Sequence, residues 1–338
     1  MRIEAFSLGK KFGHPEANED SFVAIPGAGY AVIDGVTDRN GTRYAGMLSG
    51  QFASRTVKRA TERFLCEQQA PRVAPEFAWR GPRAFIDYLT AAIRDAYIAE
   101  GVLEAVEDDW KARAGCTVMA AIHVGERIEV VAVGDSGIRV NGTDLLQVLK
   151  PLDDVTGLLR RETWRFFEAR GLSAAECDRL AASMTWLGTR NQPAGSETAD
   201  QQVIGEIRKR ALAACHERLP GLPDSEMLHL IDNGIAHGQG EYQNVTDKAL
   251  GYGGLDGFAV PDRYVEHRSY AAADVTTLEL YSDGYFEPGK GFGVEMWETA
   301  FRDVETADPH KIDRYISTKG TTPAQLTDDR TYLGVHLK

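Results

Sequence analysis

The sequence predicts an α+β fold, with antiparallel strands and helices in separate stretches of one chain. Strand patterns gather near both ends, over residues 2–34 and 275–337. Between residues 116 and 140, three strand patterns follow one another with only short turns, which is typical of an antiparallel meander and not of a βαβ unit. Residues 155–235, in contrast, show little strand character and carry helical patterns.

The N-terminal part is predicted to contain three strands followed by two helices. Residues 2–8, 21–25 and 30–34 carry the β-branched and aromatic residues that strands favour, and a Pro-Gly turn separates the last two. Apolar residues recur at helical spacing over 47–67. A second helix is predicted over 82–100, beginning with a proline, whose missing N–H does no harm in the first turn.

The central meander is predicted over residues 116–124, 128–133 and 137–140. Gly125-Glu126 supplies a hairpin turn between the first two strands, and Asn141-Gly142 is a strong turn signal after the third.

Residues 150–250 are predicted to form a mostly helical and Gly-rich insertion within a single domain of residues 1–338. Ser173 followed by Glu176 is a capping-box pattern, which indicates the start of a helix. The polar, Gly-rich end of the segment is expected to be a loop. The predicted helices cover 160–171, 173–184 and 198–218, and the loop covers 234–257.

The C-terminal part returns to strands. A strand is predicted over 275–281, helices over 294–304 and 309–317, and a last strand over 330–337.

Composition excludes several classes of protein. The chain has 338 residues, 43% of them hydrophobic, and a net charge of −12. This acidic surplus repels phosphate backbones, so we expect no nucleic-acid partner. The longest apolar runs, such as 118–122, are too short to span a bilayer, so we expect no membrane association. Four scattered cysteines and the lack of an apolar segment after the first basic residues favour a cytoplasmic protein with reduced thiols.

Carboxylates recur where predicted strands meet turns. If these strand ends converge, the carboxylates would repel one another and raise each other's pKa unless a cation neutralised them. Hard oxygen ligands of this kind suit Mg²⁺ or Mn²⁺ better than zinc. The five positions are Glu19-Asp20, Asp34-Gly35, Gly134-Asp135, Asp283-Gly284 and Asp328-Asp329.

An ordered set of short motifs resembles the PPM (PP2C-type) metal-dependent serine/threonine protein phosphatases. The resemblance covers both ends of the chain and is poor over residues 145–250. It implies a four-layer α-β-β-α sandwich of two antiparallel sheets flanked by helices. The implied reaction is hydrolysis of phosphoserine and phosphothreonine in a phosphorylated protein substrate, by water activated at a binuclear Mg²⁺ or Mn²⁺ centre. The matching segments are 18–22, 31–35, 114–117, 131–136, 280–284 and 328–331.

The resemblance assigns roles residue by residue. Asp34 matches the carboxylate that bridges the two metals, and the carbonyl of Gly35 would bind the second metal. Asp283 and Asp328 match ligands of the first metal, so Asp34 and Asp283 would act in catalysis through the metal-activated water. Of the remaining matches, Glu19 and Asp20 lie near the second metal, acting through water, Asp135 binds a possible third ion, and Asp329 is only a turn residue.

Two departures from the family pattern affect the proposed chemistry. Pro15 stands where relatives carry a phosphate-binding Arg, so Lys11 and His14, with Lys10 beside them, are the predicted phosphate-binding residues. Lysine offers a point charge there and not the bidentate fork of arginine. Val36 stands where many relatives carry His, which leaves the general acid unassigned.

Other interpretations of the motifs are weaker. Residues 134–137 resemble the nucleophile segment of chymotrypsin-type proteases, but the nearby His123 lies in an apolar strand, only thirteen positions before Ser136. The glycines of 251–257 do not match a dinucleotide loop, and those of 289–291 do not match a P-loop. A non-catalytic PPM-like module that binds a partner is the main alternative. The sequence does not indicate which phosphoprotein is the substrate, or the oligomeric state.

Overall fold

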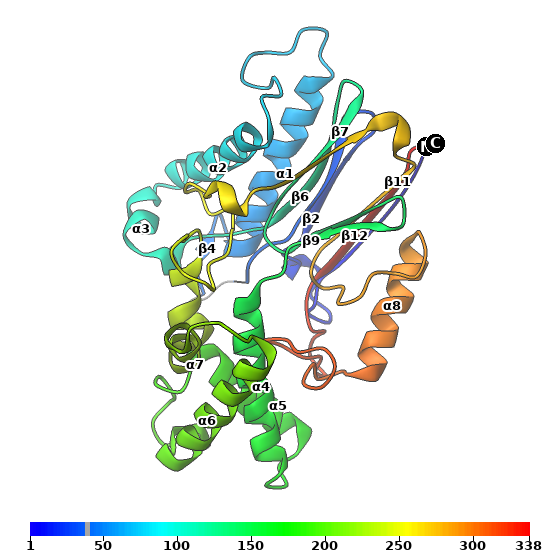
Figure 1. Cartoon of the computed structure of the whole chain (residues 1–338). Helices are drawn as coiled ribbons and strands as arrows, with labels where there is room; N and C mark the ends of the chain where they lie inside the picture. The colour runs from blue at the N-terminus through cyan, green and yellow to red at the C-terminus, as the bar shows by residue number, and fades with distance from the viewer. Residues whose placement is uncertain (38–40) are drawn as a thin grey trace. The chain divides into compact units, whose positions relative to one another are not determined.

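The computed structural model describes residues 1–37 and 41–338, and the chain divides into two compact units (Figure 1). The first unit comprises residues 1–149, 253–301 and 328–338, and the second comprises 150–252 and 302–327. The predicted insertion of residues 150–250 therefore falls in the second unit, which also takes a later segment of the chain. That the whole chain forms one domain stays a prediction.

The first unit is built on two five-stranded sheets in which every strand pairing is antiparallel. One sheet has the order β1-β12-β11-β8-β9, and the other has the order β10-β7-β6-β3-β2. The first sheet consists of β1 (Arg2–Leu8), β12 (Arg330–His336), β11 (Thr277–Tyr281), β8 (Gly137–Val140) and β9 (Asp144–Gln147). The second consists of β10 (Glu266–Ala271), β7 (Arg127–Val133), β6 (Val118–Val124), β3 (Gly29–Ile33) and β2 (Ser21–Ile25).

The alternation of side chains along each strand places one core between the two sheets. On β6, Met119 and Ala121 pack with Ile138, Leu280 and other residues of the opposite sheet. The intervening residues of β6 point to the other face, where they meet the helices. A strand with both faces buried needs apolar residues at every position, which explains the unbroken apolar run of residues 118–122.

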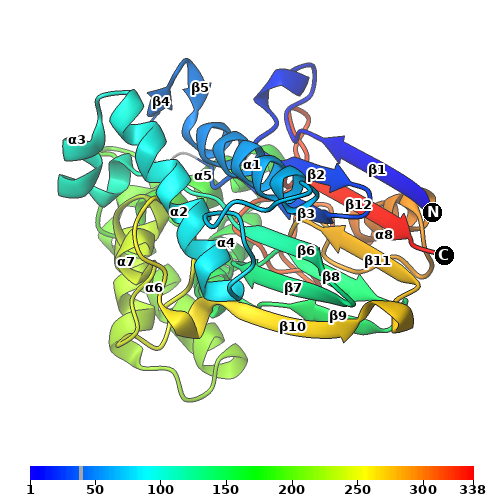
Figure 2. The ribbon, with the colours of Figure 1, turned by 90° about the horizontal axis from the view of Figure 1, so that it is seen from above.

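Helices cover the outer faces of both sheets. Helices α1 (Ser49–Gln68) and α2 (Pro82–Ala99) share a core with β2, β3 and β6, and Figure 2 shows them lying across that sheet. On the other sheet, Trp297 of α8 (Val294–Ala307) contacts Tyr281 and Tyr332, with ring centroids 4.6 and 5.1 Å apart. The predicted four-layer α-β-β-α sandwich is thus confirmed in this unit.

The second unit is a helical bundle with its own core. Its helices are α4 (Pro151–Glu168), α5 (Ala174–Leu187), α6 (Gln201–Arg218) and α7 (Asp224–Gly238). Leu159, Leu180, Ile207 and Leu230, one from each helix, are buried in that core. The predicted capping box is confirmed, because the Ser173 side chain accepts from the Glu176 N–H while the Glu176 carboxylate accepts from the Ser173 N–H.

The predicted helix over 309–317 is wrong. The buried Asp308 carboxylate accepts hydrogen bonds from the backbone N–H groups of Ile312, Asp313 and Tyr315, at 2.9–3.2 Å. It folds the chain into turns around a single side chain, and Lys311 adopts a positive φ of 53° within them. Local side-chain acceptors of this kind compete with helical hydrogen bonds.

Several helices and strands had no clear signal in the sequence, or begin at residues other than those predicted. Strands β9 and β10 and helix α7 were not predicted, α4 begins nine residues before its predicted start, and the predicted loop over 234–257 begins inside α7. The remaining elements are β4 (Arg43–Tyr44), β5 (Met47–Leu48), α3 (Leu103–Asp108) and the 3-10 turns η1 (Pro15–Ala17), η2 (Trp110–Ala112), η3 (Glu197–Ala199), η4 (Gln239–Tyr242), η5 (Asp262–Tyr264) and η6 (Ala272–Asp274).

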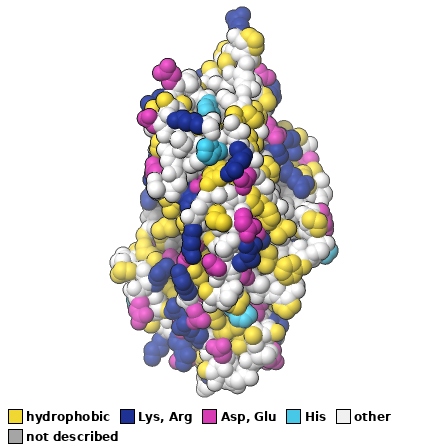
Figure 3. All heavy atoms as spheres, turned by 90° about the vertical axis from the view of Figure 1, so that its right-hand side faces the viewer, with side chains coloured by type: hydrophobic (Ala, Val, Ile, Leu, Met, Phe, Trp, Pro, Cys, Tyr) yellow, Lys and Arg dark blue, Asp and Glu magenta, His cyan; other side chains and the backbone are white. Residues whose placement is uncertain are grey.

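Two further features concern the surface and the helices. On the face drawn in Figure 3, basic, acidic and hydrophobic side chains are interspersed. Among the residues that the structure describes, no helix has both the length and the apolar character that a membrane crossing requires.

Candidate metal centre

Three of the predicted ligands converge at one end of the sandwich. Asp34 directly follows β3, Asp135 lies between β7 and β8, and Asp283 comes just after β11. One carboxylate oxygen from each lies within 4.8 Å of the others. Because β3 and β7 belong to one sheet and β8 and β11 to the other, the cluster draws on both sheets.

The backbone around Asp34 explains why a glycine follows it. The Asp34 carbonyl accepts from the Thr117 N–H at 2.8 Å, and Gly35 forms a bridge with Cys116. A Cβ on Gly35 would lie 2.5 Å from the Gly50 carbonyl oxygen, at the start of α1. Only glycine fits between the strand end and this helix, so the Asp-Gly pair is required by packing as well as by any chemistry at the site.

Crowding perturbs the two central carboxylates. Burial, together with the charges of Asp20, Asp328 and Asp135, raises the pKa of Asp34 well above its usual value. Burial and the charges of Asp34, Asp135 and Asp328 raise the pKa of Asp283 in the same way. Anions held side by side are unfavourable, so the crowding favours the neutral form of these carboxyls unless a cation is bound.

Asp20 contributes a buried oxygen that faces the same cluster. The Ser282 hydroxyl donates to Asp20 Oδ2 at 2.8 Å, whereas Asp20 Oδ1 has no hydrogen-bond partner among the described residues. Burial and the neighbouring Asp329 and Asp283 charges raise the pKa of Asp20 to about 7. A buried acceptor without a donor is costly, and a cation would satisfy it.

Lys10 supplies a positive charge beside the cluster. Its ammonium lies 2.9 Å from Asp328 Oδ1, 2.9 Å from Asp329 Oδ2 and 3.4 Å from Glu19 Oε2, and its side chain is only 6% exposed. Burial alone would lower the pKa of Lys10, but the three carboxylates raise it well above its usual value. Asp329, predicted only as a turn residue, also accepts the Lys10 backbone N–H at 2.7 Å.

The predicted phosphate-binding residues lie at the surface, close to Lys10 in the sequence. Lys11 and His14 are exposed, and His14 Nδ1 is 3.0 Å from the Glu16 carboxylate. Of the three basic residues in this segment, Lys10 alone is buried against the acidic cluster, a difference that sequence reasoning missed. The one available signal was its place next to the strand end at Leu8, where the chain turns inward.

The donor set fits Mg²⁺ or Mn²⁺. It consists of crowded carboxylate oxygens, and it includes a buried oxygen that has no hydrogen-bond partner among the described residues. These hard oxygen donors match the preference of both ions. The residues that would hold a cation are Asp34, Asp283, Asp135, Asp20 and Asp328; Gly35 and Glu19 adjoin them in the sequence.

The protease alternative finds no support in the geometry. Ser136 is buried, and its hydroxyl is 2.8 Å from that of Thr117. His123 instead contacts Tyr30 edge-on, with ring centroids 6.3 Å apart. Neither contact pairs a nucleophile with a base, as hydroxyl attack would need.

Comparison with known proteins gives only distant structural likenesses. No family model and no curated protein matches the chain. Solved structures that it resembles include the Mycobacterium tuberculosis serine/threonine phosphatase PstP/Ppp, at 16% identity and a TM-score of 0.43 over 100% of this chain and 98% of that one. A second is the serine/threonine phosphatase Stp1 from Staphylococcus aureus, at 12% identity and a TM-score of 0.41 over 100% of this chain and 96% of that one. A third is RsbX in complex with magnesium, at 10% identity and a TM-score of 0.39 over 98% of this chain and 92% of that one. TM-scores below 0.5 support no argument about this site, which rests on the chain's own residues.

Proposed function

We propose that this chain is a metal-dependent phosphoprotein phosphatase that hydrolyses phosphoserine and phosphothreonine. The observation that carries the proposal is the convergence of Asp34, Asp135 and Asp283 within 4.8 Å, at the ends of strands from both sheets. Asp20 and Asp328 act electrostatically on the same group. Such a set of half-buried carboxylates repels itself without a cation, so it supports a site built for one.

The residues have distinct proposed roles. Asp34, Asp283 and Asp328 would hold one ion. Asp34 and the Gly35 carbonyl, with Glu19 and Asp20 acting through water, would hold a second, and Asp135 would serve a possible third. Divalent ions, when bound, lower the pKa of water and withdraw negative charge from a phosphoryl group. Asp34 and Asp283, whose pKa values are raised, would release protons as they take up the charge of the cation.

The phosphate group of the substrate would need cationic partners in addition. Lys11 and His14 are exposed on the segment that follows β1, where a phosphoprotein could reach them from solvent. Lys10 is already engaged with Asp328, Asp329 and Glu19. We assign phosphate binding to the two exposed residues and charge balance to Lys10.

The test is hydrolysis of p-nitrophenyl phosphate and of a phosphothreonine peptide, with and without Mn²⁺. We expect turnover of both substrates only with the metal, and a loss of at least about 100-fold in kcat/KM for Asp34→Asn. Asp144→Asn, which changes an exposed aspartate on β9, is the matched control and should retain full activity. Turnover that persists in EDTA, or an Asp34→Asn variant that stays active, would refute the proposal.

A non-catalytic partner-binding module is the second candidate. The observation that favours it is Lys10, whose ammonium lies within 3.4 Å of three carboxylates of the acidic region and compensates part of their charge without any metal. Calorimetric titration separates the two candidates, because the phosphatase must bind Mn²⁺ or Mg²⁺. No heat of binding at millimolar metal would favour the module.

A further inference from the structure

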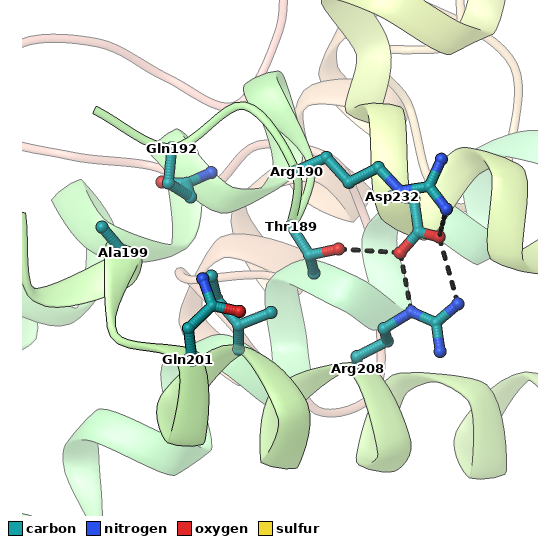
Figure 4. A pocket seen from close by; sticks show the side chains of 8 residues that line it. Thr189, Arg190, Gln192, Ala199, Gln201, Arg208 and Asp232 are labelled. Carbon is teal, nitrogen blue, oxygen red and sulfur yellow. Dashed lines mark hydrogen bonds and ion pairs between the residues drawn. The ribbon is translucent and has the colours of Figure 1, made fainter. Parts of the chain in front are cut away.

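The helical unit contains a pocket of its own, away from the predicted ligands in the sequence. It has a volume of about 380 Å³ and is lined by residues of the loop after α5, of α6 and of α7. Figure 4 shows Thr189, Asp232 and Arg208 joined by hydrogen bonds, with Gln192, Ala199 and Gln201 on another side. All of these residues belong to the second unit, and the prediction of phosphatase activity made no use of them.

Asp232 organises the charged side of this pocket. Its Oδ1 accepts from the Thr189 hydroxyl at 2.8 Å and from Arg208 Nε at 2.7 Å. Its Oδ2 accepts from Arg208 Nη2 at 3.1 Å and lies 3.2 Å from Arg190 Nη2. Burial would raise the pKa of Asp232, but these hydrogen bonds and both guanidinium charges lower it below the usual value. The carboxylate therefore stays ionised and holds two arginines at one place.

The two arginines keep donors for a further group. One carboxylate faces two guanidiniums, so the charged side of the pocket has a surplus positive charge. Arg190 is 68% exposed and Arg208 is 39% exposed, whereas Asp232 is 5% exposed. Asp232 engages one terminal nitrogen of Arg190 and leaves Arg208 Nη1 unused. Two guanidiniums that meet at one carboxylate and retain N–H groups suit a multidentate oxyanion.

The rest of the wall suits an organic group attached to that anion. Gln201, Ile204 and Arg208 lie at i, i+3 and i+7 on α6, so they share one face of the helix. That face combines an amide, an apolar side chain and a guanidinium along the pocket. The pocket is also larger than an isolated oxyanion requires.

We propose that this pocket binds a small phosphomonoester, with its phosphate on Arg190 and Arg208 and its organic part along α6. A phosphate dianion compensates the surplus positive charge better than a single carboxylate does, and it has more acceptor oxygens for the remaining N–H groups. The proposal does not depend on the phosphatase function, because no residue of the metal centre takes part.

Calorimetric titration of the full chain tests the proposal. O-phospho-L-serine, inorganic phosphate and L-aspartate are titrated separately in EDTA, so that no hydrolysis needs to be considered. We expect O-phospho-L-serine to bind more tightly than inorganic phosphate, and L-aspartate to bind about tenfold more weakly than O-phospho-L-serine. Arg190→Ala should weaken binding of O-phospho-L-serine by about tenfold or more, and Arg190→Lys should weaken it less.

Two variants separate this pocket from other phosphate sites. Lys209→Ala removes an exposed positive charge from α6 without lining the pocket, and it should leave the affinity unchanged. Lys11→Ala, at the proposed phosphate-binding segment of the other unit, should also leave it unchanged. Arg190→Ala keeps Asp232 paired with Arg208, so the variant should fold, which circular dichroism checks. No binding by the wild-type chain, or equal affinity of wild type and Arg190→Ala, would overturn the proposal.

Discussion

Replacing Lys10 by methionine should destabilise the metal-free protein strongly. The Lys10 ammonium has two carboxylate oxygens at 2.9 Å and a third at 3.4 Å, in a nearly buried position. At an effective dielectric constant of about 20, each closer pair attracts by about 6 kcal/mol, which offsets the cost of burying these charges. Removing one partner of a buried ion pair costs about 3–5 kcal/mol, because the other charges stay behind without compensation.

The assay is thermal unfolding in EDTA at pH 7, with Lys11→Met as the control. For a unit of this size, about 3 kcal/mol corresponds to a fall of roughly 6–12 °C in Tm. Lys11 is exposed, so its variant should stay close to wild type. The pKa of Lys10 is raised in the folded state, so its contribution should be complete below pH about 10.4 and decline only at higher pH. The difference between Lys10→Met and wild type should therefore be constant from neutral pH up to that limit.

Metal binding provides a second test of the Lys10→Met variant. Without the ammonium, the carboxylates of Asp328 and Glu19 no longer share their charge with Lys10, so Mn²⁺ should bind about tenfold more tightly and restore much of the lost Tm. A Lys10→Met protein that melts with wild type in EDTA would refute the reasoning. So would a variant that Mn²⁺ fails to stabilise more than it stabilises wild type.

Three further outcomes are expected. In EDTA, the free energy of unfolding should fall as pH rises from about 4 to 7, because the pKa of Asp20 is raised to about 7 and folding then opposes loss of its proton. Urea unfolding at several pH values measures this dependence, and Mn²⁺ should remove it. Gly35→Ala should lower the free energy of unfolding by at least about 2 kcal/mol, because the added Cβ would clash with the backbone. Gly205→Ala on α6 has open space around the added Cβ and should stabilise the protein by up to about 1 kcal/mol. Equal effects of the two substitutions would contradict the packing argument. The double variant Lys11→Ala/His14→Ala should raise KM for a phosphopeptide by about tenfold with unchanged Mn²⁺ affinity, and an unchanged KM would mean that other groups hold the phosphate.

Periodicity and turn residues were enough to predict most strands and helices of the first unit, whereas the four-layer sandwich itself was predicted from the family resemblance. The strands β1, β2, β3, β6, β7, β8, β11 and β12 and the helices α1, α2 and α8 fall close to their predicted positions. Each has a strong local signal, such as an apolar run or a flanking glycine. Strand β10 had none, because its sequence EHRSYA is polar and its residues, at a sheet edge, are half-buried or exposed. Pairing with β7, a tertiary effect, makes it a strand.

The sequence was enough to predict the acidic residues of the candidate site but not the buried lysine beside them. Asp34, Asp135 and Asp283 each follow a strand end, so a fold that aligns those ends brings them together. The role of Lys10 depends on which of two neighbouring lysines points inward, and their sequence context is nearly the same. The sequence also gave no sign of the pocket around Asp232, because its residues come from a loop and two helices that meet only in the folded bundle.

The helical unit is encoded by two separated stretches of the chain. Ile312 and Ile316, from the later stretch, pack into the same core as α4, α5, α6 and α7. In addition, Arg160 of α4 donates to the His310 carbonyl at 2.5 Å. A gene that lost only the codons for residues 150–252 would therefore leave Ile312 and Ile316 without the core that buries them. The helical unit could therefore be removed or exchanged as a whole only by coordinated changes at both places in the gene. Its second stretch lies between α8 and β12, so any such change must also preserve these two elements.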